Sequence, residues 1–221
     1  MYSLVLKDLL IQKKMIRFLL LYGIFILIAF NNEVFTDVTY VMAAVAGAYM
    51  LLQGACAYES KGSSEMVLNS FPLSREEIVR SRYLSVFVFT LLSLAIIGLL
   101  GAVMKLCGLP FPLRYVSWFD LAVVLISMMI MATIYLPLFF KYGYIQSRIF
   151  NVIMFMLIFF APSLLIDYYQ GHSENVVLQQ LTTIMQSSPS WLISLAIGLV
   201  FILIYYVSYR FSVIIYRHRE F

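Results

Sequence analysis

The side chains that could perform catalysis or bind a metal are few and far apart in this sequence. His172 and His218 are its only histidines, and two distant histidines do not supply the ligand cluster of a metal site. The run Lys61-Gly62-Ser63-Ser64 contains the residue types of a phosphate-binding loop, but in the wrong order to cradle a nucleotide. We therefore expect any ATP hydrolysis that drives this protein to occur on a separate chain.

Two patterns resemble parts of intramembrane proteases, and both are incomplete. Glu76, Glu77 and Arg80 approach the Glu-Glu-x-x-x-Arg signature of CAAX-type membrane proteases, but the spacing is one residue short. A rhomboid-type serine protease needs a histidine within the bilayer, whereas we place His172 in an outer loop and His218 in the C-terminal tail. We expect no catalytic site, no metal site and no bound cofactor on this chain.

The composition is that of a membrane protein. Of the 221 residues, 63% are hydrophobic and only 12% are charged, whereas a soluble domain is about half apolar and about one quarter charged. Aromatic residues reach 16%, as expected where tyrosine and tryptophan rings lie at the lipid interface. No loop is long enough to hold a core of its own, so we predict a single all-α, polytopic membrane domain over residues 1–221.

Hydrophobic runs predict six transmembrane helices, each of about 20 residues. The second is rich in alanine and glycine, which permit the close helix approach that stabilises packing in lipid. Pro162 is expected to kink or end the fifth. The predicted spans cover residues 15–35, 38–57, 83–106, 118–140, 149–166 and 191–209.

The segments outside the spans also have expected structures. Residues 1–17 are predicted to form a helix in the cytosolic interface, because Ser3, Lys7, Lys14 and Arg17 share one helical face. Residues 58–82 form a cytosolic loop, and residues 167–190 an outer loop.

The basic residues are distributed very unevenly about these spans. Of the 15 lysines and arginines, only Lys105 and Arg114 fall on one side of the membrane. By the positive-inside rule the other side is the cytosol, which places both termini there. The net charge of +4 therefore reflects topology, and we expect no nucleic-acid partner. Cys56 and Cys107 lie near opposite faces, so they are not expected to form a disulfide.

The cytosolic loop contains two helix signals separated by a proline. Ser63 or Ser64 can cap a short helix that Pro72 would end. Ser74, followed by Glu77 at capping-box spacing, then begins a second helix that continues without a breaker into the third span. Glu76 and Arg80 have the favourable spacing for an ion pair on that helix. Mechanically, the loop is either a solvated connection or an element that transmits force to the third span.

The run Asn-Ser-Phe-Pro-Leu-Ser-Arg-Glu-Glu-Ile-Val-Arg-Ser-Arg-Tyr at residues 69–83 resembles a stretch in the permease subunits of ABC-2-type ABC transporters. The layout of the whole chain is also similar to that family. In the family this loop holds a coupling helix that docks on an ATPase subunit. The resemblance implies an ATPase-coupling site formed by Ser64, Glu65, Met66, Val67, Leu68, Asn69, Phe71, Pro72, Ser74 and Arg75.

The same resemblance implies partners and a location. They are two copies of a cytosolic ABC ATPase, which carry ATP and Mg, and a second permease chain, either identical or a sister subunit. The protein is then a multi-pass protein of the bacterial plasma membrane, surrounded by its lipids. It would export a hydrophobic or amphipathic substrate, such as a peptide, an antibiotic or a lipid-like molecule. The alternative is a substrate-binding, immunity or assembly module that is not driven by ATP.

Overall fold

The computed structural model describes residues 2–30, 36–60, 74–107, 115–171 and 190–218. Over these residues the fold is entirely helical, without a β-strand. This agrees with the predicted all-α class. The helices are α1 (Tyr2–Ile11), α2 (Lys13–Ala29), α3 (Thr36–Ser60), α5 (Arg75–Leu106), α6 (Trp118–Gly171) and α8 (Ser190–Arg217).

Four stretches of the described helices are long and apolar enough to cross a membrane. They overlap the second, third, fourth and sixth predicted spans. The first predicted span corresponds to α2, which has 17 residues, and the fifth to the later part of α6. The four stretches are Thr39–Glu59, Arg75–Leu106, Trp118–Ser147 and Gly198–Arg217.

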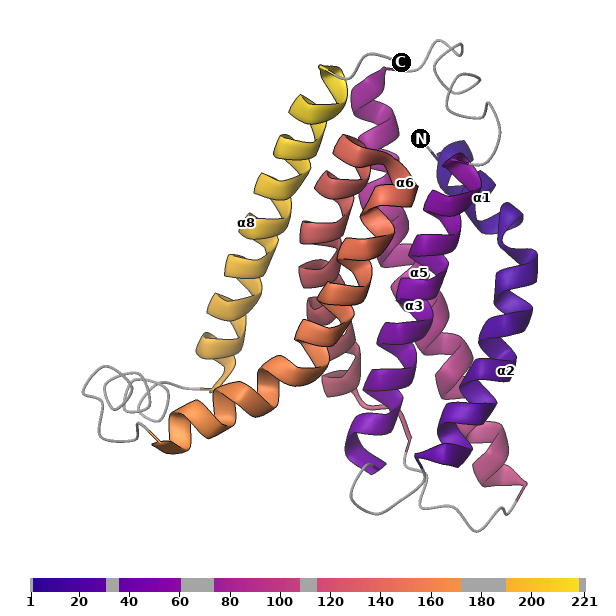
Figure 1. Cartoon of the computed structure of the whole chain (residues 1–221). Helices are drawn as coiled ribbons and strands as arrows, with labels where there is room; N and C mark the ends of the chain where they lie inside the picture. Colours follow the sequence, from indigo (N-terminus) through magenta and orange to yellow (C-terminus); the bar gives the residue numbers. More distant parts are fainter. Residues whose placement is uncertain (1, 31–35, 61–73, 108–114, 172–189, 219–221) are drawn as a thin grey trace.

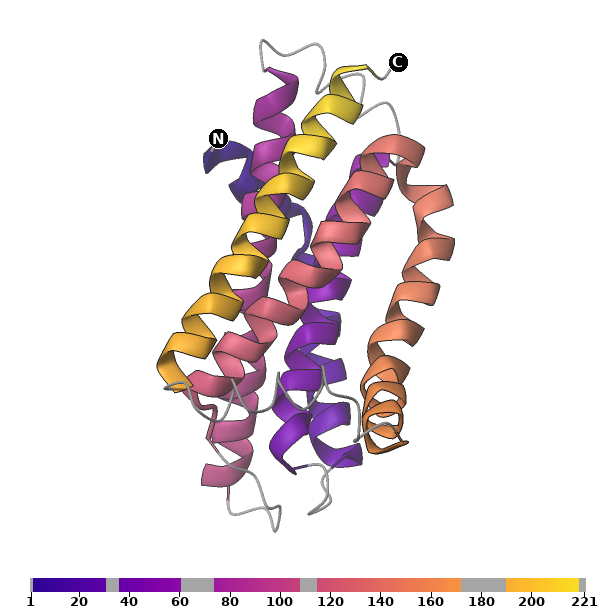
Figure 2. The same ribbon diagram turned by 90° about the vertical axis from the view of Figure 1, so that its left-hand side faces the viewer.

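Helix α6 consists of two parts separated at Gly143. This residue has φ 78° and ψ 178°, a left-handed conformation that glycine adopts at little cost. The Ser147 hydroxyl donates a hydrogen bond to the Gly143 carbonyl and so supports the reversal. The two parts run back alongside each other (Figures 1 and 2), as predicted for the fourth and fifth spans. The second part continues past Pro162 to Gly171, so this proline does not end the helix.

The N-terminal segment differs from the prediction of one interfacial helix over residues 1–17. Helix α1 ends at Ile11 and α2 begins at Lys13, with Gln12 at the break between them. Asp8 and Gln12 are buried, and the Gln12 side-chain amide donates to the Leu51 carbonyl of α3 at 2.7 Å. Helix α1 is thus packed against the other helices by polar contacts that its amphipathic pattern did not reveal.

Helix α3 is packed between α2, α5 and α6. Its Ala44 and Ala48 are completely buried, and the Ser93 hydroxyl of α5 donates to the Ala44 carbonyl at 2.9 Å. A Cβ atom at Gly47 would collide with side chains of α2 and α5, because Leu19 and Ser93 lie against it. The small residues of this span therefore permit the close helix approach that the sequence predicted.

The helix ends at one end of the bundle carry most of the basic residues. Helix α1, the end of α3, the start of α5, the reversal at Gly143 and the end of α8 all lie there (Figure 1). We name this the basic end, defined by Lys7, Arg82, Lys141 and Arg217. The end of α2 and the start of α6 lie at the opposite end (Figures 1 and 2).

Candidate functional site

Helix α5 starts with the capping box that the sequence predicted. Ser74 has extended backbone geometry, with φ −70° and ψ 143°. Its hydroxyl accepts a hydrogen bond from the Glu77 N–H at 3.2 Å, and its own N–H donates to Glu77 Oε2 at 3.0 Å. From this cap α5 continues for 32 residues to Leu106. Helix α5 is therefore one continuous helix that runs from its cap at the basic end across the bundle.

A buried arginine near the start of α5 binds two carboxylates from other helices. Arg82 Nη1 donates to Asp8 Oδ2 of α1 at 3.0 Å, and Arg82 Nη2 donates to Glu59 Oε2 of α3. The three residues are only 4%, 5% and 9% exposed. The Ser85 hydroxyl also donates to Asp8 Oδ2, at 3.1 Å. One guanidinium thus joins α1, α3 and α5, and we name Asp8, Glu59 and Arg82 the arginine cluster.

A neighbouring lysine balances the formal charge of this cluster. Lys7 Nζ lies 3.9 Å from Asp8 Oδ1, so two cations face two carboxylates. Partial burial lowers the pKa of the Lys7 ammonium; Asp8 opposes this effect and Arg82 adds to it. Because desolvation makes an unpaired buried charge costly, the ion pairs with Arg82 offset part of the cost of burying both carboxylates.

The arginine cluster lies on either side of the loop that the sequence singled out. Glu59 is in the last turn of α3, just before residues 61–73, and Arg82 is seven residues into α5, just after them. Of the predicted coupling residues, the structure describes Ser74 and Arg75. The other eight lie outside the described residues: Ser64, Glu65, Met66, Val67, Leu68, Asn69, Phe71 and Pro72.

The first turn of α5 is also joined to the end of α8. Arg75 Nη1 donates to the carbonyl oxygens of Tyr216 at 3.3 Å and Arg217 at 2.8 Å. An arginine is favourable there, because the last carbonyls of a helix carry partial negative charge. Glu76 forms an ion pair with Arg217 at 2.8 Å, rather than the helical pair with Arg80 that the sequence predicted.

About two turns further along, Tyr83 connects α5 to α8 and, through Ser208, to α6. Its hydroxyl lies 2.8 Å from the hydroxyls of Ser208 and Ser212, and its carbonyl accepts from the Tyr205 hydroxyl at 2.8 Å. Ser208 in turn donates to the Thr133 carbonyl of α6 at 2.7 Å. The first three turns of α5 are therefore bonded directly to α1, α3 and α8, and through Ser208 to α6.

Several polar residues outside this region have local structural roles. Asp120 is buried and accepts a hydrogen bond from the Ser117 N–H at 2.8 Å at the start of α6. Lys105 lies 4.0 Å above the centre of the Tyr115 ring. Cys56 is buried and Cys107 is exposed, and both are free thiols, as predicted.

These features define a multi-pass helical membrane protein whose polar contacts concentrate at one end of one long helix. The chain matches the family model described as ABC-2 family transporter protein over residues 3–217. Because this match covers nearly the whole chain, the protein belongs to the ABC-2 transporter family. Members of that family are normally non-catalytic membrane components that work with an ABC ATPase subunit. Searches of curated proteins and of solved structures gave no match.

Proposed function

We propose that this protein is the permease subunit of an ATP-driven ABC-2 exporter. The observation that carries the proposal is the family match over residues 3–217. Two permease chains, identical or sister subunits, form the translocation path together with two copies of a cytosolic ATPase. ATP and Mg bind to the ATPase, which fits the wrong residue order at Lys61-Gly62-Ser63-Ser64 for a phosphate-binding loop on this chain.

The proposed topology has six membrane spans with the basic end in the cytosol. Helix α2 and the part of α6 after Gly143 add two spans to the four candidates. Seventeen helical residues extend about 26 Å, close to the thickness of the hydrocarbon core, and Arg17 can reach the headgroups by snorkelling. The concentration of basic residues at one end supports this orientation.

Within this exporter, residues 64–71 form the coupling helix that docks on the ATPase. The arginine cluster supports this role because it connects the two helices between which the loop lies. The ion pair between Glu59 and Arg82 joins the helix before the loop to the helix after it. A displacement of the loop would then be transmitted to α5. Helices α1 and α8 would move with α5, because they are bonded to it.

The proposed substrate is hydrophobic or amphipathic. Within the described spans, the buried acidic and basic side chains are near the helix ends, at Glu59, Arg82 and Asp120. A carrier driven by protons or sodium usually places such groups at mid-membrane. This pattern supports transport of an apolar or amphipathic molecule, such as a peptide, an antibiotic or a lipid-like compound, powered by a separate ATPase.

Co-purification with a candidate ATPase tests the proposal. The full chain and the ABC ATPase encoded beside it are co-expressed, and the complex is isolated through a tag on the permease after mild extraction. We compare wild type with Glu65→Arg and with a Val67→Asp/Leu68→Asp double variant. Lys141→Glu is the matched control, because it reverses an exposed charge at the basic end outside the loop.

We expect the ATPase to co-purify with wild type and Lys141→Glu, and the loop variants to release most of it while still inserting into the membrane. Failure of any ATPase to associate with wild type would contradict the permease proposal and favour a module that is not driven by ATP. Full retention by both loop variants would contradict the role of residues 64–71.

A further inference from the structure

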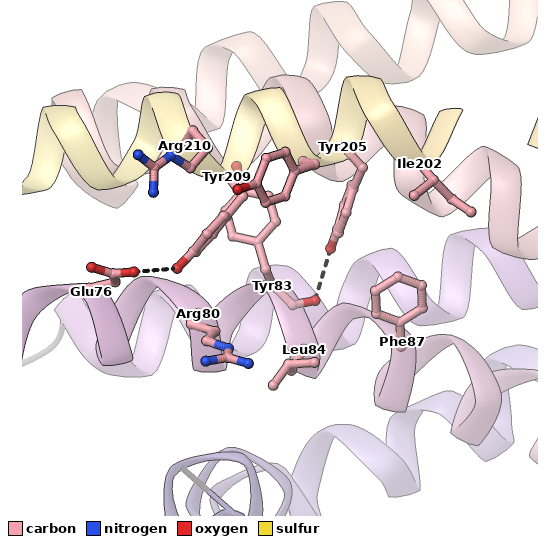
Figure 3. Close-up of a pocket in the computed structure, with 10 residues that line it drawn as sticks. Glu76, Arg80, Tyr83, Leu84, Phe87, Ile202, Tyr205, Tyr209 and Arg210 are labelled. Atoms are coloured by element: carbon pink, nitrogen blue, oxygen red, sulfur yellow. Dashed lines mark hydrogen bonds between the residues drawn. The ribbon is translucent and has the colours of Figure 1, made fainter. Parts of the chain in front are cut away.

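A groove of about 460 Å³ opens between α5 and α8 at the basic end. Its walls consist of four tyrosines, two arginines, one glutamate and three apolar side chains. Figure 3 shows Glu76, Arg80 and Arg210 at one end of the groove, and Phe87 and Ile202 at the other. One end of the groove is therefore charged and the other end is apolar. The proposed transport function assigns no role to this groove.

The charged end of the groove has an excess of positive charge. Arg80 and Arg210 are exposed, and neither forms an ion pair with a carboxylate among the described residues. Glu76 is the acidic residue in the groove wall, and its charge is already offset by Arg217 at 2.8 Å. The Tyr209 hydroxyl also donates to Glu76, at 3.2 Å. Two guanidinium groups from different helices are thus available to an anion.

Polarity changes in the same direction along both walls. Arg80 is followed by Leu84 and Phe87 on α5, while Ile202 and Tyr206 precede Arg210 on the antiparallel α8. The helical rise places the arginines about 10–12 Å from the apolar end on each wall. This is the spacing between the phosphate of a phospholipid and the upper part of its acyl chains, and tyrosines are typical of that depth.

The length of α5 places Arg80 at the depth of the lipid headgroups. Its 32 residues extend about 48 Å, whereas the hydrocarbon core is about 30 Å thick. The first turns of α5 therefore reach the headgroup layer, and Arg80 is in the second turn. The apolar end of the groove is open at the surface of the chain, where Ile202 is 57% exposed.

We propose that this groove binds an anionic phospholipid of the leaflet at the basic end. The phosphate binds at the charged end of the groove, where the exposed Arg80 and Arg210 stand on the two walls (Figure 3) and charge-assisted hydrogen bonds are strong. One acyl chain follows Leu84, Phe87 and Ile202 towards the centre of the bilayer. Because the two arginines come from different helices, the bound lipid braces the start of α5 against α8.

Native mass spectrometry of the detergent-purified full chain tests this site. Phosphatidylglycerol and phosphatidylcholine with identical acyl chains are titrated separately, and each is also offered in the presence of excess inorganic phosphate. We compare wild type with Arg80→Gln, Arg210→Gln and the double variant. Arg17→Gln is the control, because Arg17 is an exposed arginine on α2 outside the groove.

We expect wild type to bind phosphatidylglycerol in preference to phosphatidylcholine. Each groove variant should lower the affinity for phosphatidylglycerol about fivefold, as expected for one basic residue near an anionic surface, and Arg17→Gln should not. Ile202→Trp is a second test that leaves the charges intact. Its larger ring should obstruct the acyl path and weaken binding of the long-chain lipid, while circular dichroism retains the wild-type helix content.

Four outcomes would overturn the proposal. Equal binding of the two lipids, or equal losses in Arg17→Gln and the groove variants, would mean that the groove does not select an anionic lipid. Full competition by inorganic phosphate would identify a free anion as the ligand. Conversion of a dimeric wild type to monomers by Arg80→Gln and Arg210→Gln, without change in lipid binding, would assign the groove to a contact between two copies of the chain.

Discussion

Glu59 and Arg82 form a buried ion pair that joins the last turn of α3 to the early turns of α5, on either side of residues 61–73. The other Nη atom of Arg82 binds Asp8 of α1. The guanidinium is therefore shared by three helices that are far apart in the sequence. In the proposed mechanism, this contact makes the loop and the helices beside it move as one unit.

Arg82→Met should strongly destabilise the protein, because it removes the guanidinium that both buried carboxylates, Asp8 and Glu59, bind. Loss of one partner of a buried ion pair typically costs about 3–5 kcal/mol. Reversible unfolding of the detergent-solubilised protein by dodecyl sulfate, followed by circular dichroism, would measure this cost. Arg17→Met is the control, with an expected change below about 0.5 kcal/mol.

Neutralising the whole arginine cluster should restore much of the lost stability. The triple variant Asp8→Asn/Glu59→Gln/Arg82→Met removes both carboxylates together with the guanidinium, so its unfolding midpoint is expected to lie well above that of Arg82→Met. If the triple variant is less stable than Arg82→Met in the same assay, the ion pairs are not what Arg82 contributes.

Ser74→Ala should loosen the start of α5. The variant loses the hydroxyl that accepts from the Glu77 N–H, and removal of such a cap typically costs about 1 kcal/mol. Amide hydrogen exchange followed by mass spectrometry should show faster exchange confined to the first turns of α5. Ser74→Asp retains a capping oxygen and should exchange like wild type; equally fast exchange in both variants would contradict the capping role.

Tyr83→Phe should weaken the contact between α5 and α8. It removes the hydroxyl that lies 2.8 Å from both Ser208 and Ser212, and side-chain hydrogen bonds between membrane helices are worth about 0.6–2 kcal/mol. A double-mutant cycle with Ser212→Ala, measured in the same unfolding assay, should give a positive coupling energy. Strictly additive effects would show that the two hydroxyls do not interact.

Gly47→Ala should be destabilising, whereas Gly198→Ala should not. The added methyl group at position 47 meets Leu19 and Ser93, while at position 198 nothing lies within 4 Å. Overpacking costs about 1–3 kcal/mol, and alanine in place of an unconstrained helical glycine gains up to about 1 kcal/mol. Opposite shifts in thermal stability are expected; equal shifts would mean that α3 does not pack closely on α2 and α5.

Features that depend on local sequence were predicted accurately. The capping box at Ser74 follows from two residues three positions apart, and the reversal near Lys141 follows from the polar gap between two apolar runs. The close packing of α3 follows from its alanine and glycine content. Each is determined by neighbouring residues, so each can be read without knowledge of the tertiary fold.

The polar contacts between helices could not be predicted in this way. Arg82 contacts Asp8 across 74 positions and Glu59 across 23, and in the sequence it reads as one more basic residue of a cytosolic loop. Glu76 has Arg80 at ideal helical spacing, yet Arg217 binds it because α8 ends beside it. The hints in the sequence were the acidic Asp8 in α1 and the two serines four positions apart on α8, Ser208 and Ser212.

The central claim is that residues 64–71 connect an ATPase to α5. The most direct measurement is the vanadate-sensitive ATP hydrolysis of the permease–ATPase complex in liposomes. We predict that the Val67→Asp/Leu68→Asp variant lowers hydrolysis to the rate of the ATPase alone, while Lys141→Glu retains the wild-type rate. A wild-type rate in the Val67→Asp/Leu68→Asp variant, with the variant permease inserted normally, would contradict the account.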